Sequence, residues 1–188
     1  MGRGPLAGPV VAAAVIFPQD VIIKGINDSK KLSPIERLSL SVEIKAQALA
    51  TSVALVPPGE IDKYNILKAS LMAMRRAIFS LAIKPEVVLV DGREKIGQLG
   101  IPQVAIVKGD SQSQSIAAAS ILAKVARDQM MEKLHHEFPH FDFLHNQGYA
   151  TKSHKEALSK FGPSPIHRKS FSPVQKAWAE SKAKRLRL

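Results

Sequence analysis

Short apolar runs alternate with longer segments of helical periodicity along this chain, and that alternation constrains the fold most strongly. The short runs are rich in β-branched residues, which favours strands, whereas the longer segments repeat their apolar residues every three or four positions. The expected strands cover residues 9–17, 51–56, 86–90 and 103–107, and the expected helices cover 34–49, 64–82 and 113–136. Strands that alternate with helices predict an α/β fold with helices packed on a sheet. We expect the 188 residues to form one domain, 1–188.

Capping residues predict where two of the helices begin. Ser33 precedes a proline at the first helical position, and Glu36 follows three residues after the cap, which is the pattern of a capping box. At the start of the long helix, Ser111, Ser113 and Ser115 could each bond phosphate or cap the helix, and we favour Ser111 as the cap. Apolar residues at helical spacing predict the apolar stripe of the first two helices. These residues are Ile35, Leu38, Val42 and Leu49 in the first, and Ile66, Leu67, Leu71, Met74, Ile78 and Leu81 in the second.

The charge balance indicates which partners the chain favours. It holds 27 Lys and Arg against 16 Asp and Glu, a net charge of +11. Such an excess draws the chain toward nucleic acid, with a merely basic soluble protein as the alternative. The lack of cysteine excludes disulfides and thiolate metal sites. Pro5, Gly8 and Pro9 interrupt the apolar start, which argues against a signal peptide, and no apolar run reaches the ~18 residues that span a bilayer. We therefore expect a cytoplasmic protein without membrane contact.

An aspartate stands at the end of the third expected strand. Residues 87–90 are apolar, Asp91 follows directly, and Gly92 lets the chain turn away. Because strand ends edge the ligand crevice of open α/β sheets, a carboxylate there can hold a divalent cation. The alternative is that Asp91 caps a turn, as Asp-Gly pairs often do.

A second aspartate lies on the long helix. Small and aliphatic residues at 116–123 predict a helix that packs closely on a sheet, and the face that carries Ile121 also carries Asp128. A carboxylate on such a face needs a metal ion, or a partner such as Arg127 or Lys124. Together with Asp91 it favours an oxygen-ligand Mg²⁺ or Mn²⁺ site, with the two carboxylates within about 8 Å of each other. Asp28 and Asp62 lie in polar loops, where we expect ordinary turn roles.

Seven segments in order make the chain closely similar to the bacterial ribonuclease HII family. They are "GRGPLAGPVVAAAV", "NDSKKLS", "IDKYNIL", "LVDG", "VKGDSQSQSIAAASILAKVARD", "NQGYATKSH" and "GPSPIHRKSF", and the resemblance extends over roughly residues 2–175. The resemblance implies a ribonuclease H-like mixed sheet flanked by helices, with a helical, substrate-binding part at about 140–188. It also implies hydrolysis of the phosphodiester 5′ of a ribonucleotide in RNA–DNA hybrid or ribonucleotide-containing duplex DNA. The products would be a 3′-hydroxyl and a 5′-phosphate, formed by two-metal-ion catalysis with Mn²⁺ or Mg²⁺.

The same resemblance assigns roles to residues of this chain. Asp91 and Asp128 match metal-binding catalytic carboxylates, and Gly2, Arg3 and Gly4 match the loop that reads the RNA–DNA junction. Tyr149 matches a tyrosine that stacks on the deoxyribose beyond the junction. Four cations are expected to contact phosphate, namely Lys30, Lys31, Arg168 and Lys169. His167 is open between a phosphate ligand and a structural hydrogen bond. The family further implies a monomer that serves DNA replication and repair.

The family pattern also bears on the start of the chain. In the family, a strand that ends in an Asp-Glu pair precedes the glycine loop, whereas this sequence starts at Met1, immediately before Gly2. Of the four expected carboxylates, Asp91 and Asp128 carry over. The expectation is a chain that binds hybrid duplex but cuts it more slowly than a form carrying the pair. The alternative is a catalytically inactive, basic RNA–DNA hybrid-binding protein.

Overall fold

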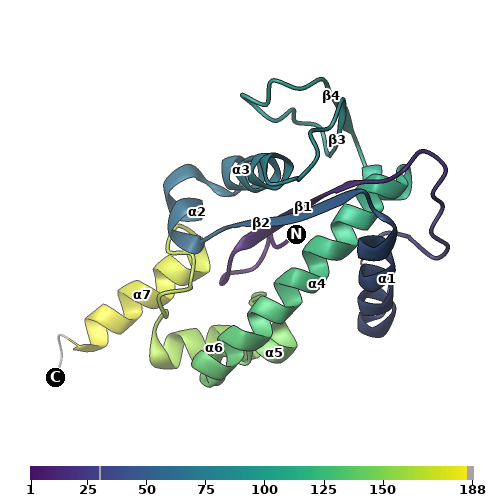
Figure 1. Ribbon diagram of the computed structural model, residues 1–188. Coiled ribbons are helices and arrows are strands. Elements are labelled where there is room, and N and C mark those ends of the chain that lie inside the picture. The colour runs from purple at the N-terminus through teal and green to yellow at the C-terminus, as the bar shows by residue number, and fades with distance from the viewer. Residues whose placement is uncertain (30, 186–188) are drawn as a thin grey trace. The chain divides into compact units, whose positions relative to one another are not determined.

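The computed structural model describes residues 1–29 and 31–185 of the chain (Figure 1). Strands and helices alternate along most of the chain, and helices alone follow the last strand. In order they are β1 (Val10–Ile16), α1 (Pro34–Gln47), β2 (Ala50–Val56), α2 (Pro58–Tyr64), α3 (Ile66–Phe79), β3 (Val88–Asp91), β4 (Gln103–Ile106), the 3₁₀ turn η1 (Gly109–Ser111), α4 (Gln114–Glu137), the 3₁₀ turn η2 (Pro139–Phe141), α5 (Phe143–Asn146), α6 (Lys152–Phe161) and α7 (Ser172–Arg185). The α/β class predicted from the sequence is confirmed.

The chain divides into two compact units, each assembled from separate segments. The first unit comprises Met1, Val11–Leu55 and Ser70–Ala126, and the second comprises Gly2–Val10, Val56–Ala69 and Arg127–Leu188. The first unit therefore holds nearly all of the strands. The second unit holds the glycine loop, which comprises residues 2–9, together with α5, α6 and α7.

The first unit contains paired strands and two apolar clusters. β1 pairs with β2, and β3 runs parallel to β4 with Val90 opposite Ala105. One cluster joins Ala118, Ile121 and Leu122 of α4 to Leu40 and Ile44 of α1, with side chains of β1 packed against it. The other cluster joins the buried side chains of β3 to those of α3 and of the loop that precedes β4. The small residues of α4 thus pack as the sequence predicts.

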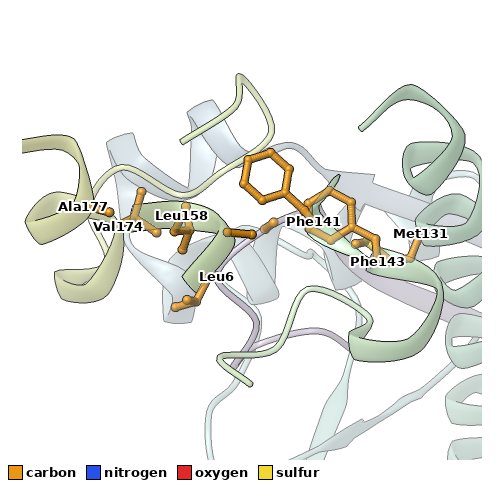
Figure 2. Packing of buried hydrophobic residues seen from close by; sticks show 9 residues of the cluster. Leu6, Met131, Phe141, Phe143, Leu158, Val174 and Ala177 are labelled. Carbon is orange, nitrogen blue, oxygen red and sulfur yellow. The ribbon is translucent and has the colours of Figure 1, made fainter. Parts of the chain in front are cut away.

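The second unit has its own apolar core, which includes Leu6 and Ala7 from the start of the chain. Figure 2 shows Phe141 and Phe143 between Met131 of α4 and Leu158 of α6, with Leu6 of the glycine loop in the same cluster. The two phenylalanine rings stack with centroids 5.5 Å apart. Since Leu6 is buried here, the glycine loop is anchored in this core by its own apolar side chain.

The helix predicted over 64–82 forms as two helices. Asn65 separates α2 from α3 with φ 68°, and its side-chain oxygen accepts hydrogen bonds from the N–H groups of Leu67 and Lys68. Pro58 occupies the first position of α2, where its missing N–H costs nothing. Asn65 tolerates this left-handed backbone and caps the next helix, which is why the helical pattern breaks there.

The predicted capping box is confirmed, but the apolar stripe predicted for α1 is wrong. Ser33 and Glu36 each accept from the other's backbone N–H. Ile35 and Val42 are nevertheless 82% and 65% exposed, whereas the buried face carries Arg37, Leu40, Ser41 and Ile44. Arg37 donates to the carbonyl oxygens of Ser29 and Leu32, so this face is chosen by a polar loop that α1 covers.

Two further expectations about helices need correction. In α3 the fully buried positions include Ala69, Ala73 and Ala77, while Leu67, expected to face inward, is exposed. Alanine occupies the buried face because its small side chain allows the closest packing. At the start of α4, Ser113 takes the capping role instead of Ser111, because its hydroxyl accepts from the N–H of Ile116.

Candidate nucleic-acid interface

The glycine loop, residues 2–9, has a backbone that requires glycine at two positions. Gly2 and Gly8 have φ of +83° and +81°, in the left-handed region that side chains disfavour. A Cβ on Gly2 would collide with the Arg127 guanidinium, and one on Gly8 would lie 2.5 Å from Sδ of Met131. The loop therefore approaches α4 more closely than a chain with side chains there could.

Arg168 supports this loop from inside the second unit, and this corrects its predicted role. Its side chain is 0% exposed. The guanidinium donates to backbone carbonyl oxygens of Gly2, Arg3, Gly8 and Pro9 at 2.7, 3.1, 3.0 and 3.3 Å. Burial lowers the pKa of Arg168 to about 9, with the nearby Arg127 charge acting in the same direction. A phosphate contact by this buried side chain, as the sequence suggested, does not fit these contacts.

Arg127 lies at the same loop and was considered in the sequence only as a partner for Asp128. Its guanidinium donates to carbonyl oxygens of Ala7, Pro9 and Gln147 at 3.4, 3.4 and 3.0 Å. Burial lowers the pKa of Arg127, and the charges of Tyr149 and Asp128 oppose that shift. One buried cation thus bridges the glycine loop and the tyrosine loop, residues 147–151.

Tyr149 stands in the tyrosine loop beside the glycine loop. Its side chain is 48% exposed. The backbone N–H of Leu6 donates to the Gly148 carbonyl at 2.7 Å, and a Cβ on Gly148 would lie 2.7 Å from the carbonyl oxygen of Ala7. A Cβ on Gly4 would lie 3.5 Å from the Tyr149 ring. The structure therefore brings together Gly4 and Tyr149, which the sequence predicted for one substrate site.

Two buried histidines hold the backbone of Tyr149. Nδ1 of His154 lies 2.7 Å from the Tyr149 carbonyl oxygen, and Nε2 of His154 lies 3.0 Å from Nε2 of His167. The Ser164 N–H donates to Nδ1 of His167 at 3.0 Å. Because Nδ1 of His167 accepts this bond, the ring proton of neutral His167 is on Nε2, which donates to Nε2 of His154. The ring proton of His154 is then on Nδ1, which donates to the Tyr149 carbonyl oxygen. Burial, followed by the His154 charge, lowers the pKa of His167 to about 3, so the chain of neutral rings persists at neutral pH. Of the two roles open for His167, these contacts fit the structural hydrogen bond.

Asp62 is a site-supporting residue that sequence reasoning missed. Its carboxylate accepts from the backbone N–H groups of Lys169 and Ser170 at 3.0 and 2.8 Å, and from the Ser170 hydroxyl. The sequence predicted a turn role near its own position, but its partners lie more than a hundred residues away. Lys169 itself is exposed, with Nζ 4.7 Å from the centroid of the Trp178 ring.

The two candidate metal ligands belong to different units. Asp91 is exposed at the end of β3, where its Oδ1 accepts the Gly109 N–H at 3.1 Å. Gly109 lies 18 residues further along the chain, so this bond is not the local Asp-Gly turn contact that the sequence left open as an alternative. Asp128 is half-buried on α4 in the second unit. Across residues 1–29 and 31–185, no group of three or more His, Cys, Asp or Glu side chains is placed to hold a metal ion. Their metal role and their separation of about 8 Å stay predictions.

The remaining predicted contacts are two lysines of the polar loop before α1. Lys31 is exposed in a turn in which its N–H donates to the Asp28 carbonyl. Lys30 lies outside the described residues. Both stay predictions.

Comparison with known proteins gives consistent matches over most of the chain. The family model described as Ribonuclease HII matches residues 1–174. A Ribonuclease HII of Idiomarina loihiensis is 53% identical over 178 residues, 95% of each chain. The structure is similar to that of ribonuclease H2 from Pyrococcus horikoshii OT3, with TM-score 0.82, 27% identity, and coverage of 97% of this chain and 95% of that one. It also shares the fold of Bst-RNase HIII in complex with Mn²⁺, with TM-score 0.79, 20% identity, and coverage of 97% and 68%. No helix within the described residues is long and apolar enough to cross a membrane.

Proposed function

Since the chain belongs to the ribonuclease HII family, whose members are endoribonucleases acting on RNA–DNA hybrids, we propose that it hydrolyses the phosphodiester on the 5′ side of a ribonucleotide. The products are a 3′-hydroxyl and a 5′-phosphate. The substrates are RNA–DNA hybrid and duplex DNA with embedded ribonucleotides. The protein acts as a cytoplasmic monomer in DNA replication and repair.

The observation that carries this proposal is the pairing of the glycine loop with an exposed tyrosine. Backbone groups at Gly2–Gly4 can approach a sugar closely because glycine lacks a side chain, and an N–H or C=O there can test the 2′-hydroxyl that separates RNA from DNA. The Tyr149 ring lies beside Gly4 and is exposed enough to stack on a neighbouring sugar or base. Together they form a surface suited to a junction between ribose and deoxyribose.

Asp91 and Asp128 are the residues that would hold a divalent ion. Carboxylate oxygens suit Mg²⁺ and Mn²⁺, and such ions are commonly bound by one or two carboxylates together with water and substrate phosphate. The donor chemistry therefore fits one ion, while a two-metal site needs further oxygen ligands. When bound, the ion supplies Lewis-acid stabilisation and an acidified water. The residues of the chain orient the duplex, and Lys31 and Lys169 position its phosphates.

Cleavage of a labelled duplex with one embedded ribonucleotide, in Mn²⁺ and in Mg²⁺, tests the proposal. We expect a single cut 5′ of the ribonucleotide with 3′-hydroxyl and 5′-phosphate ends, and no cut in an all-DNA duplex of the same sequence. A chain that binds the ribonucleotide duplex without cutting it supports the second candidate, an inactive basic hybrid-binding protein.

A further inference from the structure

The Arg168 side chain is arranged as a brace for the glycine loop. Four of its N–H donors reach the two limbs of the loop, which are Gly2 and Arg3 on one side and Gly8 and Pro9 on the other. A guanidinium offers five donors in a rigid planar fork, so one side chain sets the spacing and orientation of both limbs.

The segment that carries Arg168 is itself fixed on both sides. The Arg168 N–H donates to the Leu6 carbonyl at 2.8 Å, and the preceding His167 forms an antiparallel bridge with Ala7. On the other side, the Asp62 carboxylate holds the next two backbone N–H groups. The guanidinium therefore projects from an anchored backbone, which makes its four bonds a constraint on the loop.

The direction of these bonds determines how the loop presents its peptide groups. In a trans peptide the C=O and the N–H point in opposite directions. Because the carbonyls of Gly2 and Arg3 face Arg168, the N–H groups of Arg3 and Gly4 point away from it. Both residues are exposed, and these N–H groups are donors of the kind that a 2′-hydroxyl oxygen accepts.

Lysine cannot reproduce this arrangement. Its ammonium is a compact, strongly hydrated charge with three donors, so it cannot bond four carbonyls on the two limbs of the loop at once. Even with a pKa lowered to about 9 by burial, Arg168 keeps its charge at neutral pH and makes charge-assisted bonds.

We propose that Arg168 is a positioning residue that holds the Gly2–Gly4 loop in the shape that distinguishes ribose from deoxyribose, and that it acts without contacting phosphate. This inference rests on the proposed function of the loop. It separates two kinds of cation that stand next to each other in the sequence: buried Arg168 serves selectivity, and exposed Lys169 serves affinity.

Equilibrium binding without divalent metal tests the proposal on the full chain. Anisotropy titrations compare a duplex that contains one ribonucleotide with an all-DNA duplex of the same sequence, at several salt concentrations. For Arg168→Lys we expect the ratio of the two affinities to fall about tenfold, with the slope of log affinity against log salt unchanged. Lys169→Ala is the matched control, and it should weaken both duplexes alike and reduce the salt slope by about 0.9.

Two further measurements separate loop positioning from loss of folding. In Arg168→Ala, millimolar guanidinium ion should restore the ratio, whereas an equal ionic strength of sodium chloride should not. Asp62→Asn weakens the bonds that hold the backbone next to Arg168, so it should lower the ratio of the two affinities by less than Arg168→Lys does. This variant tests the proposal even if neither Arg168 variant folds.

The outcomes are distinguishable. If the unaltered protein binds both duplexes alike, the proposed function of the loop fails. If the unaltered protein prefers the ribonucleotide duplex, and Arg168→Lys and Asp62→Asn both show the same affinity ratio as the unaltered protein, the positioning role is overturned. If Arg168→Lys weakens the affinity for both duplexes equally and also reduces the salt slope, Arg168 is a phosphate contact. That result would overturn the positioning role as well.

Discussion

The glycine loop and the end of β3 differ in how firmly the chain holds them. At the glycine loop, the buried side chains of Arg127 and Arg168 hold five backbone carbonyl oxygens, namely those of Gly2, Arg3, Ala7, Gly8 and Pro9. At the end of β3, the Asp91 carboxylate is exposed and accepts one backbone N–H from Gly109. A preorganised loop loses little freedom on binding, whereas an exposed carboxylate keeps rotamer freedom until a ligand orders it. If the proposed function holds, the recognition loop is fixed by the fold before substrate binds, whereas the candidate metal ligand is ordered when substrate and ion bind.

Removing the candidate metal ligands should have the largest effect and should separate chemistry from binding. Asp91→Asn and Asp128→Asn should each slow cleavage roughly a hundredfold, because the amide keeps the shape but loses the charge that attracts a divalent ion. Duplex affinity without metal should change less than about threefold. Single-turnover cleavage and anisotropy measure the two effects. Exposed Asp20→Asn is the control, and unchanged cleavage in either test variant would remove that residue from the metal site.

Adding a methyl group to the glycine loop should test how tightly it is held. Gly8→Ala should lower the free energy of unfolding by about 2–4 kcal/mol, from its left-handed backbone and the collision with Met131. Gly25→Ala is the matched control, since φ is +83° there but nothing lies within 4 Å of the added Cβ. It should cost only about 1–2 kcal/mol. Urea unfolding measures both, and equal losses would mean that the loop is less constrained than its contacts imply.

Shortening Tyr149 should affect recognition of the junction. Tyr149→Ala should weaken binding to a ribonucleotide-containing duplex by about 1–3 kcal/mol and binding to plain DNA by less, because stacking is lost beside Gly4. Tyr149→Phe should keep most of the affinity. Tyr64→Ala, at another exposed tyrosine, serves as the control in the same anisotropy titrations. Equal losses on both duplexes for Tyr149→Ala would assign Tyr149 a structural role.

Lowering the pH should have the smallest effect, a modest loss in the free energy of unfolding from the histidines that support the tyrosine loop. The pKa of His167 is about 3 when folded against 6.5 as the ordinary value. The unfolded chain therefore binds the proton first, and stability present above pH 6.5 is lost as the pH falls toward 3. Between pH 7.5 and 5.5 this histidine should cost about 1.4 kcal/mol. Urea unfolding at both values measures it, with exposed His145→Gln as the control. A His167→Gln variant with the same pH dependence as the unaltered protein would contradict the assignment.

Local sequence patterns were sufficient wherever the determining partners are near in sequence. The Ser33–Glu36 capping box joins groups three residues apart, and the strands depend on short apolar runs, so both could be predicted. The buried face of α1 could not be predicted in this way. It is determined by contacts with the carbonyls of Ser29 and Leu32 and with apolar side chains of α4, not by the hydropathy of α1 itself.

The candidate site shows the same division. The sequence alone determined the family through its ordered segments and the α/β class through its alternating strands and helices. The resemblance also named Gly2, Gly4, Tyr149, Asp91 and Asp128 as candidate site residues, and their roles stay predictions. Only the tertiary structure decided what the buried polar residues do. Arg168 and its carbonyl partners at Gly2 and Arg3 lie some 165 positions apart in the chain. A basic residue looks the same in sequence whether it faces phosphate or a ring of carbonyls, because burial, which selects between the two, is a property of the folded chain.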